Sequence, residues 1–155
     1  MKDLSMVQAA LREFMRWAEE RDVKALLNAG ELADSLAIPS WADKFLKAVK
    51  PILVEQDRVK ILFLTKAGKQ CIWPLTSDPS LTKIVVASFS INPSRVAELF
   101  EKGAAKVEDR LEATRKLQEY GYEIRLRIDP IIPISTWRED YHKLVRSIFM
   151  NGLYC

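Results

Sequence analysis

The sequence has 155 residues, of which 48% are hydrophobic and 29% charged, and this composition suits a single globular domain, residues 1–155, rather than a disordered or fibrous chain. The formal net charge of +3 is a mild excess spread over helix faces of mixed sign, so it permits contact with nucleic acid without arguing for it. No apolar run approaches the roughly 20 residues that cross a bilayer, and the first residues do not read as a secretory signal, so we expect a cytoplasmic protein without a membrane partner.

The first predicted elements are a helix, a strand and a second helix. The first helix, ending near residues 21–22, is indicated by apolar residues spaced three or four apart: Met6, Ala10, Phe14, Trp17 and Ala18. Residues 23–29 form a short apolar run that closes on Gly30, which is typical of a buried strand followed by a sharp turn. The second helix is expected to take Ser40 as its N-cap, directly after Pro39, and to stop at Pro51.

Two further strands follow. Residues 59–65 are almost continuously apolar and β-branched, which indicates a strand covered on both faces in a parallel sheet. Residues 66–82 contain glycine and prolines, so any helix there is short or distorted. Residues 84–90 predict the third strand, and Asn92, Pro93 and Ser94 supply the cap and first-turn proline of the next helix.

The last third of the chain predicts two more helices and a strand. The helix after Ser94 is expected to break near Gly103, restart, and end at residues 120–121. Residues 122–128 predict the fourth strand. The final helix begins after Thr136, with Glu139 placed as in a capping box. Its inward face is expected to carry Trp137, Tyr141, Leu144, Val145 and Ile148.

Strands that alternate with helices through short links predict an α/β fold with an all-parallel sheet. Because the order begins with a helix, the expected architecture is a partial (β/α) barrel of about four parallel strands with flanking helices. Such a sheet has two edges whose backbone groups lack a neighbouring strand. We therefore expect a homo-oligomer in which copies cover these edges.

Polar residues end each predicted strand, and in parallel α/β folds ligands bind at the strand carboxyl ends. The candidate binding residues at this rim are Gly30, Glu31, Lys66, Ser90, Asn92, Arg127 and Asp129. Carboxylates, a lysine and hydroxyls together suit a zwitterionic, hydroxyl-rich ligand. The alternative is that these residues, Ser94 and Asn92 in particular, only end strands and cap the next helices.

Other conspicuous residues have simpler explanations. His142, the sole histidine, lies in the middle of a helix and is expected on its surface. Cys71 indicates a buried thiol, and Cys155 lies too far away in sequence for a joint metal site. The helix that contains Arg110 is rich in acidic residues, so we expect a solvated face there. The tryptophans at positions 17, 41 and 137 fall on apolar helix faces and are expected in the core.

A series of short segments then matches one family in order and spacing: Gly30-Glu31-Leu32-Ala33-Asp34-Ser35-Leu36-Ala37, Leu62-Phe63-Leu64-Thr65-Lys66, Phe89-Ser90-Ile91-Asn92-Pro93, Glu101-Lys102-Gly103, Arg110-Leu111-Glu112-Ala113, Gly121-Tyr122, Asp129-Pro130-Ile131 and Trp137-Arg138-Glu139-Asp140-Tyr141. They resemble the spore photoproduct lyases, DNA-repair-type lyases of the radical S-adenosylmethionine superfamily. The resemblance extends from the first strand to the last helix. It implies a partial barrel whose cofactor lies across the strand carboxyl ends.

By this resemblance the cofactor is S-adenosylmethionine. Glu31, next to Gly30, falls where the family approaches the amino group of the cofactor. Lys66 and Ser90, with Asn92 beside them, fall where the family contacts its carboxylate and ribose. Arg127 and Asp129 are implied to face the same cavity, and nucleic acid is a possible partner by resemblance alone.

Two departures from the family pattern limit the expected function. The CxxxCxxC motif that binds the family's [4Fe-4S] cluster lies upstream of the position of Met1, and no residues here replace it, so we expect no cluster and no activity from this chain alone. The family's hydrogen-donor cysteine lies near the stretch that here reads Gly30-Glu31-Leu32. The predicted function is a radical S-adenosylmethionine protein that is inactive by itself. The alternative is a non-catalytic barrel module that binds a nucleotide-like ligand or a protein partner.

Overall fold

The computed structural model describes residues 4–30 and 33–153. Helices and strands alternate along this part of the chain, with a short helix and a 3-10 turn between the second and third strands. In chain order the elements are α1 (Leu4–Glu20), β1 (Ala25–Asn28), α2 (Pro39–Leu53), β2 (Val59–Thr65), α3 (Trp73–Thr76), η1 (Pro79–Lys83), β3 (Val85–Ser90), α4 (Ser94–Phe100), α5 (Val107–Glu119), β4 (Glu123–Arg127) and α6 (Trp137–Met150).

The strands form one parallel sheet in the order β1-β2-β3-β4. This confirms the predicted α/β class with about four parallel strands and flanking helices. β2 covers the predicted residues, whereas β1 and β4 are shorter than predicted by one or two residues at each end. Because every strand pair is parallel, all four strand carboxyl ends lie along the same edge of the sheet.

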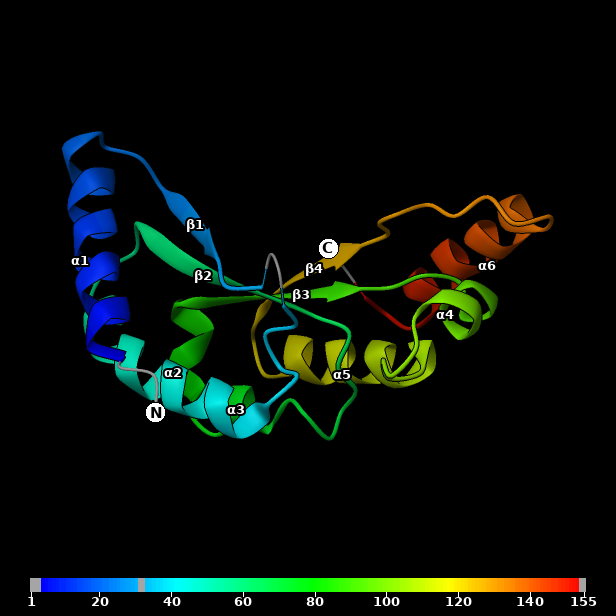
Figure 1. Ribbon diagram of the computed structural model, residues 1–155, viewed down its shortest axis with the longest axis horizontal. Helices are drawn as coiled ribbons and strands as arrows, with labels where there is room; N and C mark the ends of the chain where they lie inside the picture. The colour runs from blue at the N-terminus through cyan, green and yellow to red at the C-terminus, as the bar shows by residue number, and fades with distance from the viewer. Residues whose placement is uncertain (1–3, 31–32, 154–155) are drawn as a thin grey trace.

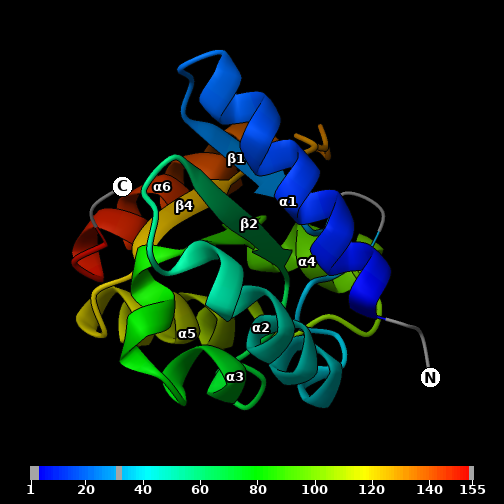
Figure 2. The ribbon, with the colours of Figure 1, turned by 90° about the vertical axis from the view of Figure 1, so that its left-hand side faces the viewer.

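One face of the sheet packs against helices. Along β2 the odd-numbered residues 59–65 are buried and the even-numbered ones are half-buried, which is the alternation of a sheet with one covered face. The main core joins this face, including Phe63 and Phe89, to apolar residues of α1, α2, α3 and α5. Figure 1 shows α2, α3 and α5 below the strands, and Figure 2 shows α1 and α2 together at the β1 end of the sheet. The predicted cover of β2 on both faces is therefore complete on one face and only partial on the other.

The opposite face of the sheet is more polar. Lys60 on β2 and Glu123 on β4 form an ion pair of 3.0 Å across β3, and Arg125 donates to the same Glu123 carboxylate at 3.0 Å. Arg127 follows two residues along on the same side of β4. The cationic side chains of Lys60, Arg125 and Arg127 therefore lie on this face, and Arg127 is the last residue of β4.

A second apolar cluster lies beyond the ends of β3 and β4. It joins α4, the first half of α5, and α6, with Ile91 and Leu153 fully buried at 0% exposure. In Figure 1 these helices occupy the right-hand side, toward which β3 and β4 point. The second cluster thus holds α4 and α6 next to the strand ends where a ligand would bind.

Several predicted helix boundaries and caps are wrong. α2 continues past Pro51 to Leu53, because Ile52 and Leu53 bury their side chains in the main core. Its N-cap is Ile38 rather than Ser40, and Pro39 opens the helix, where a missing backbone N–H costs little.

The caps predicted for the two later helices also differ. Asn92 does not cap α4; its side chain instead joins a buried polar network described below. At the start of α6 the Thr136 hydroxyl donates to Asp140 at 2.6 Å, in place of the capping box predicted with Glu139. In both cases a side chain has a better partner than the helix backbone.

The large apolar side chains of the helices are less buried than predicted. Trp17 is 43% exposed and stacks on Phe14 with a centroid distance of 5.4 Å, and Trp41 is 44% exposed and stacks on Phe45 at 5.8 Å. Met6 and Val145 also face outward, whereas Trp137 packs against the second cluster. Helical spacing identifies the apolar side of each helix, but some residues on that side, such as Trp17 and Trp41, remain partly exposed to solvent.

A surface ion pair at the start of η1 leads to a pH prediction. Lys50, together with the backbone N–H and hydroxyl of Ser80, lowers the pKa of Asp78 to about 2. A carboxyl whose folded pKa lies below its unfolded value of about 3.9 contributes stability above that value and loses it as pH falls. Asp78→Asn is therefore expected to reduce stability at neutral pH and to flatten the loss between about pH 4 and pH 2.

Chemical denaturation of both proteins across this pH range measures the effect. Lys50→Met should flatten the same part of the curve, because it removes the main cause of the lowered pKa. Parallel curves for wild type and Asp78→Asn between pH 4 and pH 2 would contradict the prediction.

Within residues 4–30 and 33–153, no helix is long and apolar enough to span a membrane.

Candidate functional site

A polar cavity of about 420 Å³ lies at the carboxyl ends of the strands. Its wall contains residues from the segments that follow β1 and β2 and from the ends of β3 and β4: Gly30, Ala33, Asp34, Leu64, Thr65, Lys66, Ser90, Arg127 and Asp129. Parallel strands bring these residues together because each strand ends at the same edge of the sheet. The volume lies within the range of sites for small molecules.

The segment after β1 folds tightly over the end of β2. The Ser35 backbone N–H donates to the Leu64 carbonyl at 2.9 Å, and the Leu64 N–H donates to the Ser35 hydroxyl at 3.1 Å. A Cβ at Gly30 would lie 2.5 Å from this hydroxyl and 2.9 Å from the same carbonyl, so the position has no room for a side chain. Gly30 therefore permits a close crossing of backbone at the cavity wall.

Asp34 fixes the end of β2. Its carboxylate accepts from the Thr65 hydroxyl at 2.7 Å and from the Lys66 backbone N–H at 2.6 Å. It also accepts from the Leu36 N–H at 2.8 Å within its own turn. The bonds to Thr65 and Lys66 join the segment after β1 to the end of β2, so Asp34 is a structural element of the wall that sets where the Lys66 side chain begins.

The Lys66 ammonium pairs with the carboxylate of Glu101, which follows α4, at 2.9 Å. The Glu101 side chain is 5% exposed and also contacts Arg110 of α5 at 2.7 Å. Burial by itself raises the pKa of Glu101, but Lys66, Asn92 and Arg110 together hold it below its ordinary value. The carboxylate is therefore ionised at neutral pH.

Asn92, two residues past β3, lies behind the cavity in the same network. Its amide donates to Glu101 at 3.1 Å and its carbonyl oxygen accepts from the Tyr141 hydroxyl at 3.0 Å. The Tyr141 oxygen in turn accepts from the Ile132 backbone N–H at 2.8 Å. Asn92 is 1% exposed, and its side-chain groups bond to partners from two other segments, Glu101 and Tyr141.

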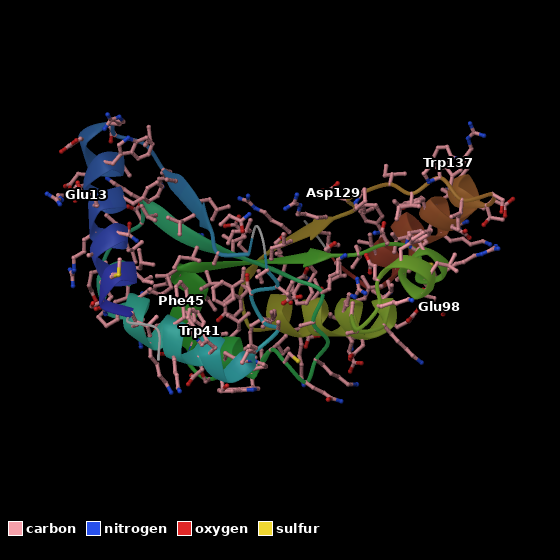
Figure 3. The ribbon with its side chains drawn as sticks, viewed as in Figure 1. Glu13, Trp41, Phe45, Glu98, Asp129 and Trp137 are labelled. Atoms are coloured by element: carbon pink, nitrogen blue, oxygen red, sulfur yellow. The ribbon has the colours of Figure 1, made fainter. Side chains whose placement is uncertain are left out.

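β4 contributes the fourth side of the cavity. Arg127 donates to the Asp129 carboxylate at 3.0 Å, and both side chains are partly exposed. Figure 3 places Asp129 on the segment that leaves β4, above the strands, whereas Trp41 and Phe45 of α2 lie below them. The register pairs Ser90 with Arg127, so the Ser90 hydroxyl and the Arg127 side chain share this side of the sheet.

A larger cavity of about 510 Å³ lies on the helix side of the sheet, between α1, α2 and the first two strands. Its walls are almost entirely apolar, with Trp41, Phe45 and Phe63 among them. None of the predicted site residues that the structure describes lines it. Among the described residues of its wall, only Asp34 and Ser35 offer groups for acid-base or ionic chemistry.

The structure thus brings together most of the residues that the sequence proposed. Gly30, Lys66, Ser90, Arg127 and Asp129 line one cavity. Asn92 lies behind its wall, and Glu31 lies outside the described residues. Among the other residues considered, His142 is exposed, as predicted, and Cys71 is half-buried and packs against the main core.

Sequence reasoning missed Glu101 and misplaced Arg110. Arg110 is 1% exposed rather than on a solvated face, and its guanidinium donates to the carbonyls of Ala105 at 2.8 Å and Ser90 at 3.0 Å. A signal existed, because Arg110 stands three residues after Val107 and four before Thr114, within the stripe that α5 buries. Glu101 stood only in the matched segment Glu101-Lys102-Gly103, without an expected role, because its burial depends on contacts between separate elements.

The described residues contain no group of three or more histidine, cysteine or acidic side chains placed to hold a metal ion. Cys71 is the cysteine that this part of the chain contains, and it is free. A four-iron cluster held by three cysteines therefore does not fit the described residues.

A family model described as spore photoproduct lyase matches residues 6–151. A curated relative, the spore photoproduct lyase of Clostridium acetobutylicum, is 29% identical over 59 residues, which are 38% of this chain and 18% of that protein.

Solved structures of spore photoproduct lyase share the fold. A complex with dinucleoside spore photoproduct superimposes with a TM-score of 0.83 at 23% identity, and a variant with bound AdoMet and the same photoproduct gives the same values. In both cases the match covers 96% of this chain and 42% of the solved chain. The chain therefore spans less than half the length of these structures.

Proposed function

Because the chain belongs to the spore photoproduct lyase family, we propose that it forms the S-adenosylmethionine-binding part of a radical lyase that acts on damaged nucleic acid. The observation that carries the proposal is the polar cavity at the strand ends, which gathers Lys66, Ser90, Arg127 and Asp129. A related structure with bound AdoMet supports the choice of cofactor.

The residues of the cavity fit the chemical groups of S-adenosylmethionine. The Lys66 ammonium suits the carboxylate of the cofactor, since a charged donor and acceptor form the stronger class of hydrogen bond. The Ser90 hydroxyl and the Asp129 carboxylate suit hydroxyl and ammonium donors. Reductive cleavage of this cofactor supplies a carbon-centred radical. The role of Lys66, Ser90 and Asp129 is to bind and orient the cofactor.

The substrate class rests on two further features. Relatives bind a dinucleoside spore photoproduct, and the polar face of this sheet presents Lys60 and Arg125, cations that suit a phosphodiester.

A hydrogen-donor cysteine has no place at Gly30, where a Cβ would meet the Leu64 carbonyl at 2.9 Å. We therefore propose a lyase-type reaction in which hydrogen transfer does not use this position.

Calorimetric titration with S-adenosylmethionine tests the cofactor site. Lys66→Ala is expected to weaken binding about tenfold or more, because it removes a charged hydrogen bond of about 1.5–3 kcal/mol. Lys69→Ala is the matched control: this lysine lies three residues away but pairs with Glu112 at 2.8 Å, outside the cavity wall.

Equal affinities of wild type and Lys66→Ala for the cofactor would refute the placement of the site. Binding of ATP as tight as that of S-adenosylmethionine would favour the alternative, a non-catalytic module for nucleotide-like ligands.

The predicted homo-oligomer is a separate proposal, supported by the open edges of β1 and β4 in the sheet order.

A further inference from the structure

The buried carboxylate of Glu101 contacts residues from several elements around the proposed cofactor cavity. Glu101 lies at the C-terminal end of α4, and its backbone N–H donates to the Ala97 carbonyl at 2.8 Å, which fixes where its side chain starts. Its carboxylate contacts the Lys66 ammonium at 2.9 Å, the Asn92 amide at 3.1 Å and the Arg110 guanidinium at 2.7 Å. These partners come from the ends of β2 and β3 and from α5.

Through these partners Glu101 reaches two residues of the cavity wall without lining the wall itself. Lys66 is held directly, and the Ser90 carbonyl is held by Arg110, which donates to it at 3.0 Å. Arg110 cannot turn away, because its other donor group bonds to the Ala105 carbonyl at 2.8 Å and the side chain is 1% exposed.

The Glu101 carboxylate is shared between two cations, so it does not neutralise Lys66 alone. Lys66 and Arg110 are both cationic, and Glu101 is the anion that contacts them. Only the Lys66 side chain is partly exposed, at 36%, compared with 5% for Glu101. Lys66, which lines the cavity, is therefore the member of this cluster that a ligand can contact.

We propose that Glu101 is a positioning residue that directs the Lys66 ammonium toward the carboxylate of an amino-acid-bearing adenosyl ligand. The inference rests on the proposed cofactor site, and it adds that the geometry of Lys66 is set by a residue that does not touch the ligand. Asn92 belongs to the same supporting layer, since its amide and its carbonyl oxygen are both occupied by protein partners.

Two adenosyl ligands separate positioning from general stability. S-adenosylhomocysteine carries the amino-acid carboxylate, and 5′-methylthioadenosine lacks it. Glu101→Gln is expected to weaken binding of S-adenosylhomocysteine about tenfold while leaving that of 5′-methylthioadenosine within about twofold. Glu112→Gln, which removes an exposed acidic group of α5 that pairs with Lys69, is the matched control and should change neither affinity.

A double-mutant cycle adds a second test. In the Lys66→Ala background, Glu101→Gln should have no further effect on S-adenosylhomocysteine, because the group that it positions is gone. An equal loss of affinity for both ligands, or additive losses in the double variant, would overturn the positioning role while leaving the cofactor site intact.

Glu101→Asp covers the case in which Glu101→Gln does not fold. It keeps the charge that Arg110 needs and withdraws the carboxylate from Lys66 by one methylene, so the same selective loss is expected to a smaller extent. If the wild-type protein binds neither ligand, the proposed cofactor site is refuted. NMR then tests the contacts of Glu101 without any ligand. The side-chain resonances of Lys66 and Asn92 should shift in Glu101→Asp and not in Glu112→Asp; unchanged resonances would overturn the inference.

Discussion

Replacing Arg110 by methionine is expected to lower the free energy of unfolding by about 3 kcal/mol or more. The guanidinium is 1% exposed and pairs with the Glu101 carboxylate, which is itself 5% exposed. Methionine fills similar space but leaves this buried charge with fewer partners and removes donors from the carbonyls of Ala105 and Ser90. Urea denaturation at neutral pH measures the loss.

Arg115→Met is the control for this prediction. It lies on the same helix, is 53% exposed and is 3.8 Å from Glu119, so its loss should stay within about 0.5 kcal/mol. Combining Arg110→Met with Glu101→Met should lower the free energy of unfolding by less than the sum of the two single changes, because no buried carboxylate is then left without its arginine partner. A loss below about 1 kcal/mol for Arg110→Met alone would contradict a buried ion pair.

Phe89→Ala is expected to have an effect of similar size, about 3–5 kcal/mol, from loss of packing. Phe89 lies on β3, the strand between β2 and β4, and is 0% exposed within the main core. Its removal would leave a cavity bounded by rigid strands, which cannot close around it as a surface site would. Thermal or chemical unfolding with circular dichroism gives the value.

The chain offers a second phenylalanine as the comparison. Phe100, near the end of α4, is 56% exposed, so Phe100→Ala should change stability by less than about 0.5 kcal/mol. Similar losses for the two variants would mean that β3 is not at the centre of the fold. Because Phe89 precedes Ser90, partial unfolding in Phe89→Ala should also weaken ligand binding.

Periodicity and turn residues predicted the order and class of the elements well. β2 is the clearest example, since its run of β-branched and apolar residues forms the strand over the same range. The failures share a physical cause. Pro51 does not end α2, because burial of Leu53 outweighs the local cost of proline, and Asn92 does not cap α4, because Glu101 and Tyr141 are stronger partners.

The candidate site was predictable to the extent that it follows from topology. Lys66, Ser90 and Arg127 line one cavity because parallel strands end at one edge, a rule that needs only the order of the elements. Glu101 and the true position of Arg110 depend on how α4 and α5 pack against the sheet. The charge of Arg110 favoured a solvent-exposed position. Only its place in the buried stripe of α5 indicated that the side chain is buried.

The network around Glu101 also has a consequence for the order of folding. Asn92 and Tyr141 are 49 residues apart, farther in sequence than the paired residues of any two neighbouring strands, so their contact closes a longer loop than the sheet does. Neighbouring strands close shorter loops and can therefore pair earlier. The polar side of the pocket is thus completed only after β3, α5 and α6 have docked, and a chain stalled before that point would contain most of its sheet but lack an organised ligand site.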